Sequence, residues 1–490
     1  MRTNLWEYMK SNLTAVILFF LNIVIGIVGT KVLSYKDIDN GILCILIVVF
    51  LVNILICCLD VEKRFIVLMF HCTIFLFLIG RILIPAIQGK QWWNYYSAEA
   101  NWFAVCSIIL ALLSIMGGTL LQEVVASSRR KRIAVKAKLI QRDCLMQILR
   151  LVLAACMICY LAGEIDKVLF MRGKAYEEYF TSYQSRMPFF ITFPAGCLKY
   201  FLCAFLALKP SKRESFIWLA AYVLSALPML KIGVRNPLIL NCIFAFCYYV
   251  LRDIIRTKDE KKWIGKFEKG LIICAIPMMI LFLGAYNYIR ADQEVELSPV
   301  NLVVDFCYKQ GTTYDTVLQG YLYKDELLNN KDINYTFGAM QEEILYNSLG
   351  KKIFQAKDIG NGNCLKRVYN GFSFAHDLSY VVMKEEYLSG HGRGSSFIIE
   401  NYVDWGYEGI IFFGLFLGSV CSAIPQMFGK RWITTTIFLM MLQNLFFIPR
   451  AEATGFLCFL VSYKFWLCMI GCIILMYCWM FIKKKMRIQI

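Results

Sequence analysis

The feature that most constrains this chain is a series of apolar blocks of about 18 to 22 residues that runs along most of its length. A helix of that length crosses the hydrocarbon core of a bilayer, and its backbone groups bond to one another there. The chain is also 59% hydrophobic and only 18% charged, which excludes a soluble globular protein. We therefore predict an all-α polytopic membrane protein of about twelve transmembrane helices. The predicted spans lie near residues 13–33, 41–59, 65–87, 102–122, 146–163, 188–208, 216–232, 237–251, 269–288, 407–427, 432–448 and 463–482.

Basic residues lie in alternate loops, and this alternation predicts the topology. By the positive-inside rule these loops and both termini are cytoplasmic, so the net charge of +17 sets orientation and indicates no nucleic-acid partner. The other loops, including the largest, then lie outside. The chain accordingly divides into transmembrane helices 1–9 (residues 1–288), an extracytoplasmic loop domain (289–405) and transmembrane helices 10–12 (406–490). The basic segments are residues 63–64, 127–138, 209–214, 252–266, 429–431 and 483–487.

The large loop is rich in aromatic residues, so we expect it to fold as short helices that cap the bundle. Its two cysteines, Cys307 and Cys364, leave open whether they form a disulfide. The single CxxC pair, Cys156 and Cys159, lies within a predicted apolar span, and we expect neither a metal nor a cofactor. A further aromatic group between Trp92 and Tyr96 lies at a predicted membrane interface, where anchoring in the membrane explains it better than sugar stacking.

Histidine is rare in this chain, and two of its three histidines lie in the large loop. His376 stands at the start of a predicted amphipathic helix, where an imidazole can act as a general base. A solvent-facing or capping histidine is the alternative. His71, within a span, is expected to be a packed polar residue. Carboxylates of the same loop are the reserve candidates for the base, namely Glu385, Glu386, Glu400 and Asp404.

The stretch GHGRGSS precedes an apolar helix and offers candidate substrate-binding residues. A glycine-rich loop that leads into a helix presents backbone N–H groups and the positive end of the helix dipole to an anion. The stretch is no Walker A or Rossmann motif, and a plain tight turn is the alternative. The candidates are His391, Gly392, Arg393, Gly394 and Ser395.

Three arginines, Arg235, Arg290 and Arg450, lie at helix ends on the predicted outer side, against the positive-inside expectation. An arginine at a membrane interface is costly unless it pairs or binds a ligand, and its guanidinium matches a phosphate with two parallel hydrogen bonds. Snorkelling to lipid head groups would explain any one of them, but not so easily all three. Arg81, at the outer end of the third span, belongs to the same cavity or snorkels. We therefore predict a pyrophosphate site.

These residues resemble a family, the O-antigen polysaccharide polymerases of the Wzy type, which are related to the O-antigen ligases. The similarity is greatest over residues 231–455, in KIGVRNPL, YKQGTTYDTVLQG, NYTFGAM, SFAHDLSY, YLSGHGRGSSFIIENYVDWGYEGIIFFGLFLG and FFIPRAEATG. The resemblance implies a metal-independent glycosyltransferase of the bacterial plasma membrane. It would transfer the growing glycan from undecaprenyl pyrophosphate onto a new lipid-linked repeat unit at the outer face.

The resemblance also implies roles for single residues. Arg235 matches the arginine in a short outer turn of the ligases, and His376 matches the histidine of their large loop. Arg290 and Arg450 match arginine positions of the polymerases. His391 and Arg393 depart from the usual glycine-rich stretch, which leaves open whether they serve catalysis or only sugar recognition. The implied partners are the lipid-linked donor and acceptor, membrane lipids and a chain-length regulator protein.

Two other functions remain open at this point. A polyprenyl-phosphate-sugar glycosyltransferase would use a carboxylate of its first outer loop, where Asp37 and Asp39 lie, although no second motif supports it. A flippase or other transporter of lipid-linked oligosaccharides also has about twelve helices, but transporters usually show related halves, and this chain shows no repeat. The resemblance therefore favours the polymerase.

Overall fold

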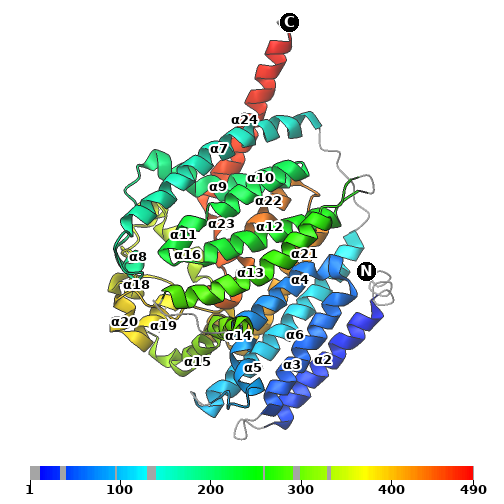
Figure 1. The fold of residues 1–490 in the computed structure, drawn as a ribbon, viewed down its shortest axis with the longest axis vertical. Helices are drawn as coiled ribbons and strands as arrows, with labels where there is room; N and C mark the ends of the chain where they lie inside the picture. Colours follow the sequence, from blue (N-terminus) through cyan, green and yellow to red (C-terminus); the bar gives the residue numbers. More distant parts are fainter. Residues whose placement is uncertain are drawn as a thin grey trace.

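The computed structural model describes residues 12–33, 40–93, 96–129, 139–257, 260–290, 298–327 and 333–488. Within these ranges every regular element is helical (Figure 1). There, 11 helices are long and apolar enough to cross a membrane. They are α2 (Leu13–Val32), α3 (Asn40–Leu59), a third span built from α4 (Val61–Ile74), η2 (Phe75–Ile79) and α5 (Gly80–Ile87), α6 (Ala98–Arg129), α7 (Leu139–Phe170), α9 (Phe189–Ala207), α10 with α11 (Lys212–Leu224 and Leu227–Ile232), α12 (Asn236–Ile254), α13 (Lys266–Arg290), α21 (Phe397–Met427) and α24 (Tyr463–Ile488).

The predicted span at residues 432–448 is the one that falls short. Its helix, α22 (Trp432–Leu445), has 14 residues. At about 1.5 Å per residue it extends about 21 Å, less than the roughly 30 Å of a hydrocarbon core. The chain then continues in short pieces, η4 (Ile448–Arg450), η5 (Gly455–Leu457) and α23 (Cys458–Val461). Hydropathy detects the apolar residues but not this early end of the helix.

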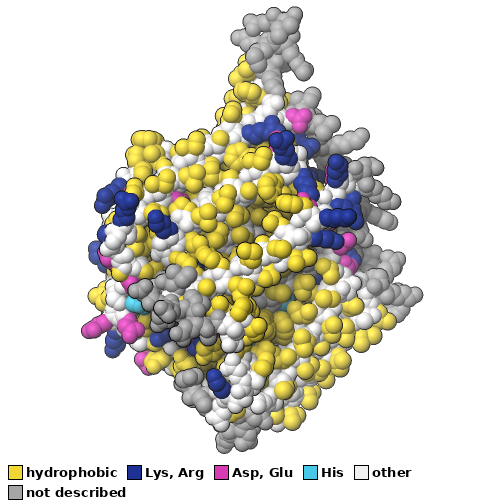
Figure 2. Space-filling model, in the orientation of Figure 1, with side chains coloured by type: hydrophobic (Ala, Val, Ile, Leu, Met, Phe, Trp, Pro, Cys, Tyr) yellow, Lys and Arg dark blue, Asp and Glu magenta, His cyan; other side chains and the backbone are white. Residues whose placement is uncertain are grey.

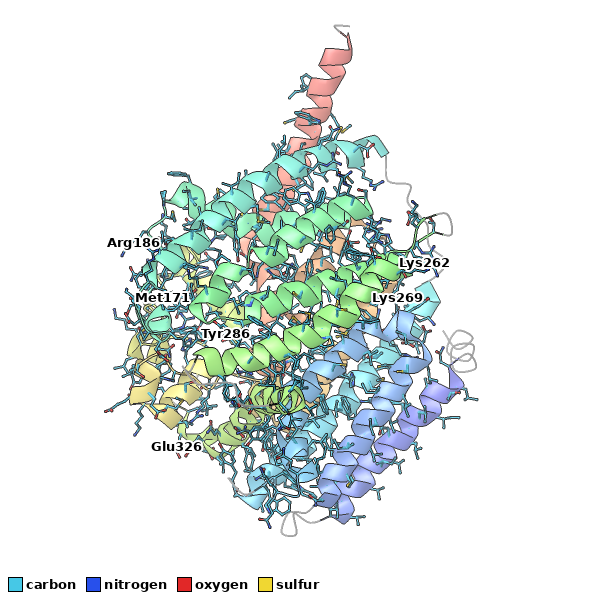
Figure 3. The ribbon with its side chains drawn as sticks, in the orientation of Figure 1. Met171, Arg186, Lys262, Lys269, Tyr286 and Glu326 are labelled. Carbon is cyan, nitrogen blue, oxygen red and sulfur yellow. The ribbon has the colours of Figure 1, made fainter. Side chains whose placement is uncertain are left out.

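Alternate loops meet at the same end of the bundle, as the sequence predicts. In Figure 3, Met171, Arg186, Tyr286 and Glu326 lie toward one end of the molecule, whereas Lys262 and Lys269 lie toward the other. Hydrophobic side chains cover the middle of the face in Figure 2, with Lys and Arg toward its two sides. Which end faces the cytoplasm, and with it the placement of both termini, stays a prediction.

Short helices gather at the end that holds Tyr286 (Figure 1). The following long helix, α21, bends at Trp405 and Gly406, where Gly406 has φ +65° and so favours glycine. This bend lies at the predicted boundary after residue 405, although the division into three parts stays a prediction. The short elements are α8 (Glu178–Ser182), α14 (Pro299–Gln310), α15 (Thr313–Leu322), η3 (Lys324–Glu326), α16 (Gly338–Tyr346), α17 (Gly350–Phe354), α18 (Leu365–Asn370), α19 (Phe374–Met383) and α20 (Glu385–Leu388).

Glycines let α21 and α6 pack with their backbones in close approach. A Cβ on Gly118 would lie 2.0 Å from the carbonyl oxygen of Leu415, and one on Gly418 would lie 1.9 Å from that of Ile115. Small residues serve this purpose between membrane helices, where close packing replaces the hydrophobic effect. This close packing against α6 positions α21, whose first turns extend to the candidate site.

Arg64 was assigned from the sequence to a basic loop, and this assignment is wrong. It lies in α4 with no exposed surface, and its Nε and Nη2 donate to the two carboxylate oxygens of Glu123 on α6, each at 2.8 Å. Its Nη1 donates to the Ile56 carbonyl at 2.7 Å. The hydrogen bonds of Arg64 therefore join α4 to α3 and α6. Because its charge is already paired, Arg64 is weaker evidence for the orientation of the chain in the membrane than the sequence suggests.

Breaking this ion pair from one side should destabilise the fold. Glu123→Leu leaves the buried Arg64 charge uncompensated, and we expect a loss of about 3 to 5 kcal/mol in the free energy of unfolding. The double variant Arg64→Met, Glu123→Leu should recover most of that loss, because no charge is then left unpaired. Thermal unfolding in detergent measures both. A Glu123→Leu protein as stable as the wild type would contradict the prediction.

Candidate functional site

The candidate site is built around residues 450–455, here called the central turn, which follow the short helix α22. Pro449 and Arg450 complete the 3-10 helix η4, and Gly455 begins the next one, η5. Ala453 and Thr454 are buried, and the other four residues of the turn are half-buried. Because α22 ends early, the turn lies among the helix ends instead of on the surface of the bundle.

Side chains of the central turn hold two segments of the large loop. Arg450 Nη1 donates to the backbone and side-chain oxygens of Gln310, at 3.0 and 3.1 Å. The Ser373 hydroxyl donates to Glu452 Oε1 at 2.6 Å, and Glu452 Oε2 accepts no hydrogen bond from a residue that the structure describes. Burial raises the pKa of Glu452. The turn therefore fixes the end of α14 and the start of α19.

Two further segments are held on its other side. The backbone N–H of Ala453 donates to Glu400 Oε2 at 2.7 Å, while the Ser395 hydroxyl donates to Glu400 Oε1 at 2.5 Å. The Thr454 hydroxyl donates to the carbonyl of Thr336 at 2.7 Å. Segments far apart in sequence thus meet at one turn. Glu400, a reserve candidate for the base, already accepts a hydrogen bond at each of its carboxylate oxygens.

The guanidinium of Arg450 has a lowered pKa. Burial, together with the positive charge of Arg235, lowers its pKa to about 10. Its guanidinium carbon lies 5.7 Å from the centroid of Phe77, a residue of the π-helix η2. In the part of the chain that the structure describes, no carboxylate lies within ion-pair distance of Arg450. A guanidinium without a carboxylate partner, with a second arginine near it, makes this turn a candidate site for an anion.

The structure thus brings two of the three predicted arginines together. Arg235 lies at the start of α12, after Gly233, which ends α11 with φ +102°. Its Nη1 donates to the carbonyl of Leu283 in α13 at 3.2 Å. Arg290 is the last residue of α13, two turns beyond Leu283, and its side chain lies outside the described part of the structure.

His376 lies one turn into α19, whose first residues are fixed to the central turn through Ser373. Its Nδ1 is 2.9 Å from the hydroxyl of Tyr387, which is buried. Burial, and then the positive charge of Arg367, lower the pKa of His376 to about 3. Arg367 is itself paired with Glu342 at 2.9 Å. The imidazole is therefore neutral and oriented, as a general base requires.

The glycine stretch does not form a single cradle. His391 is exposed, and its Nε2 lies 3.9 Å from Glu177, away from the central turn. The hydroxyl of Ser395 is used by Glu400, and the helix that follows is capped by Ser396. Arg393 is held through its backbone, whose N–H donates to the Ser379 hydroxyl at 2.9 Å.

The glycines Gly392 and Gly394 are exposed. At Gly394 no atom lies within 4 Å of an added Cβ. The plain turn, one of the two alternatives for this stretch, therefore fits better than a closed anion cradle.

Some residues of the site were not predicted from the sequence. Gln310 binds Arg450, Ser373 binds Glu452, and Tyr387 lies within hydrogen-bond distance of His376. A signal existed for Glu452, because it follows Arg450 by two residues in FFIPRAEATG. The other three carry no signal of their own, since their partners lie far away along the chain.

Other sequence expectations concern metals and disulfides. Cys307 and Cys364 are both free thiols. Over the described ranges no group of three or more His, Cys, Asp or Glu side chains could hold a metal ion. Asp37 and Asp39, the candidates for a different glycosyltransferase, lie outside the described residues. Asp404, another reserve base, accepts the backbone N–H groups of residues 335 and 336.

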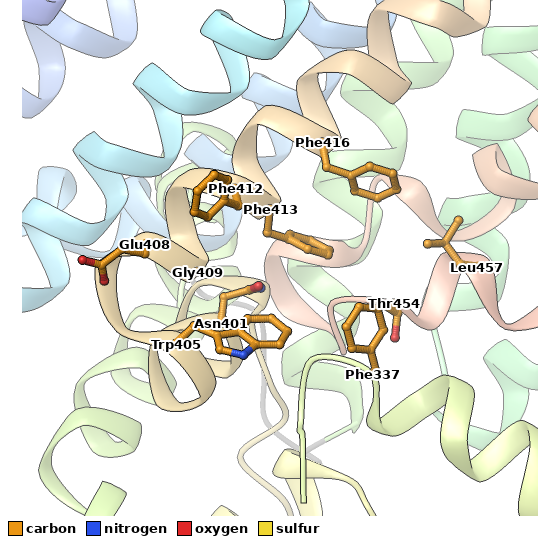
Figure 4. Close-up of a pocket in the computed structure, with 10 residues that line it drawn as sticks. All are labelled: Phe337, Asn401, Trp405, Glu408, Gly409, Phe412, Phe413, Phe416, Thr454 and Leu457. Carbon is orange, nitrogen blue, oxygen red and sulfur yellow. The ribbon is translucent and has the colours of Figure 1, made fainter.

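An apolar groove of about 590 Å³ opens beside the central turn (Figure 4). One wall is α21 around its bend, and the other contains Phe337 and residues 454–457. Several of its aromatic side chains are largely exposed, Phe412 at 71%. Thr454 belongs to both the groove and the central turn, so the two are continuous. The lining residues are Phe337, Asn401, Trp405, Glu408, Gly409, Phe412, Phe413, Phe416, Thr454 and Leu457.

The fold defines a multi-pass helical membrane protein, with a candidate anion site beside an apolar groove. Comparison with known families is consistent with this class: the family described as O-antigen polysaccharide polymerase Wzy matches residues 13–485, nearly the whole chain. The chain belongs to that family, and it is accordingly a polymerase of the glycosyltransferase type. No curated protein and no solved structure matches it.

Proposed function

We propose that the protein polymerises undecaprenyl-pyrophosphate-linked oligosaccharide repeat units at the outer face of the bacterial plasma membrane. The growing glycan is transferred from its lipid carrier onto a new lipid-linked unit. The observation that carries this proposal is the half-buried Arg450, which lies near enough to Arg235 for that charge to lower its pKa and has no carboxylate partner among the described residues. A pyrophosphate supplies the negative charge that Arg450 does not find among the described residues.

In the proposed reaction a hydroxyl oxygen of the acceptor sugar attacks the anomeric carbon of the donor. The new C–O bond forms as the bond to the lipid pyrophosphate breaks, and the pyrophosphate leaves with the electron pair. Arg235, Arg290 and Arg450 stabilise its developing charge. Pyrophosphate is a good leaving group once it is stabilised in this way, so the step needs no metal.

His376 takes the proton of the acceptor hydroxyl. For this role Nε2 must be unprotonated, so Nδ1 carries the hydrogen and donates to the hydroxyl oxygen of Tyr387. The low pKa keeps the imidazole neutral but makes it a weak base. Entry of the negatively charged pyrophosphates raises that pKa, because a nearby negative charge favours the protonated form. The base is therefore strengthened when both substrates are bound.

The apolar groove supports the lipid part of the proposal. An isoprenoid chain is uniformly apolar, and the groove offers an almost wholly apolar wall that is continuous with the central turn. We propose that it holds the polyprenyl chain of one substrate, with the pyrophosphate directed toward Arg450. The other candidate residues, Gly392, Arg393, Gly394, Ser395 and His391, are proposed only as a boundary of the sugar site.

Deletion of the gene, followed by sizing of surface glycans, tests the function. A polymerase mutant should keep products with a single repeat unit and lose the longer ladder, since synthesis and export of the unit continue. Reintroducing the gene should restore the ladder. Complete loss of surface glycan would instead indicate a flippase, and an unchanged ladder would contradict the proposal altogether.

A further inference from the structure

A second cavity, of about 660 Å³, lies at the same end of the bundle and shares no residue with the central turn or the apolar groove. Its walls come from α5, the connection from α5 to α6, the end of α13, and helices α14 and α15. Aromatic rings and polar side chains alternate along these walls. We call it the aromatic cleft, and the residues used below are Arg81, Trp92, Asp305, Tyr308 and Asp315.

Trp92 lines this cleft with a hydrogen-bond donor that is not satisfied. Its side chain is 6% exposed, and its ring packs edge-to-face on Trp93 at 5.3 Å between centroids. Its Nε1–H is buried and has no acceptor among the described residues. A buried donor without a partner is costly, and an acceptor atom on a ligand would satisfy it. Trp92 is therefore not the exposed membrane anchor that the sequence suggested.

The planar guanidinium of Arg81 is held in the cleft by an ion pair and by a neighbouring aromatic ring. Its Nη2 donates to Asp315 Oδ2 at 2.8 Å, and its guanidinium lies 4.1 Å from the centroid of the Tyr308 ring. Both partners of the ion pair keep about a fifth of their side chains exposed, at 21% and 22%. Planar groups fixed beside aromatic rings can bond paired sugar hydroxyls while a ring stacks on the C–H face of a sugar.

The charges of the cleft argue against a second pyrophosphate there. Two cations, Arg81 and Lys90, and two carboxylates line the cleft, so its lining charges balance; Arg81 is paired with Asp315, and Asp305 with Lys309 at 3.0 Å. An anion would have to separate the Arg81 pair before it could bind. A ligand with many uncharged hydroxyls can instead use the exposed donors and acceptors as they stand.

The cleft lies within one turn of the arginine site. Gln310, which binds Arg450, is followed by Gly311, and a Cβ on Gly311 would lie only 2.6 Å from the Cβ of Arg81. On the far side, the Thr316 hydroxyl donates to the carbonyl of Arg393 at 2.8 Å. A ligand that begins at the arginines can therefore extend into the cleft.

We propose that the aromatic cleft binds the oligosaccharide part of a lipid-linked substrate through uncharged sugar rings. This inference rests on the proposed function and adds a separate recognition subsite to it. The volume lies within the range of about 300 to 1,000 Å³ that small-ligand sites occupy. The subsite sets which repeat unit is accepted, whereas the arginines recognise a pyrophosphate that every such unit shares.

Trp92→Phe tests the subsite, because it keeps an aromatic ring and removes only the N–H donor. The substrate is the lipid-linked repeat unit that accumulates in cells lacking the polymerase, and the full-length protein is assayed in lipid nanodiscs. We expect KM to rise about 3- to 10-fold with kcat within about twofold of the wild type. Trp218→Phe, in α10 and away from the cleft, is the matched control and should leave both constants unchanged.

A second measurement separates this inference from the proposed function. The oligosaccharide is released from its lipid by mild acid, and its binding to the same nanodiscs is followed by saturation-transfer NMR. Weaker binding to Trp92→Phe and to Tyr308→Ala supports the cleft, even if the wild type makes no polymer and the proposed function fails. Unchanged KM in Trp92→Phe together with unchanged oligosaccharide binding in both variants would overturn the cleft and leave Trp92 as a packing residue.

Discussion

Arg235→Lys should abolish polymer synthesis as completely as Arg235→Ala, with membrane insertion intact. Lysine keeps the positive charge but not the fork that bonds two phosphate oxygens at once, and Arg235 lies beside Arg450 where such a fork is needed. Loss of one donor of this kind costs about 100- to 1,000-fold in rate. The measurement is polymer length and amount in a deletion strain that expresses each variant at equal level.

The matched control for this result is Arg186→Lys, an exposed arginine at the same end of the bundle (Figure 3). It should leave the glycan ladder unchanged. If Arg235→Lys also made the wild-type ladder, the residue would be an anchor to lipid head groups, and Arg450 would have to bind the pyrophosphate without it.

His376→Ala should lower turnover by about 100- to 10,000-fold while donor and acceptor still bind, since general base catalysis contributes that much. Purified protein supplied with both lipid-linked substrates measures it. Tyr387→Phe should lower turnover less, because it removes the partner of Nδ1 but keeps the imidazole. Normal turnover in His376→Ala would move the base to Glu452, Glu385 or Glu386, since Glu400 and Asp404 are bound to structure.

The pH dependence follows from the lowered pKa of His376. An ordinary histidine would lose activity as the pH falls through about 6 to 7. With a pKa of about 3 in the free protein, the imidazole stays unprotonated from pH 8 down to about pH 5, so protonation of His376 should cause no loss of kcat/KM in that window. This corrects the expectation that the sequence alone would give, because burial decides the pKa and burial is a property of the fold.

The fold was largely predictable because each span carries its own signal in about 20 apolar residues. The signal fails where length and pattern disagree: residues 432–448 read as a span, yet α22 ends at Leu445. It also fails for Arg64, whose partner Glu123 lies on another helix. Charge placement in the sequence shows where a residue stands along the chain, but not whether it is already neutralised.

The candidate site was predictable only in part. Arg235 and Arg450 could be placed at one end of the bundle from topology, and the structure brings them together. Their supporting contacts could not be predicted, because Gln310 and Ser373 reach the central turn from distant parts of the chain. The sequence pattern identified Arg235 and His376 as candidates and the resemblance implied roles for them, whereas the packing shows what orients them.

The short helix α22 has a further consequence for the energetics of substrate delivery. A helix that starts at one interface and extends about 21 Å stops roughly 9 Å below the opposite one. We therefore expect the central turn that follows α22 to be recessed into the leaflet. Lifting an isoprenoid out of lipid costs about 0.8 kcal/mol for each CH₂ exposed. A recessed turn lets the carrier diffuse sideways to the arginines while its tail stays dissolved in the bilayer.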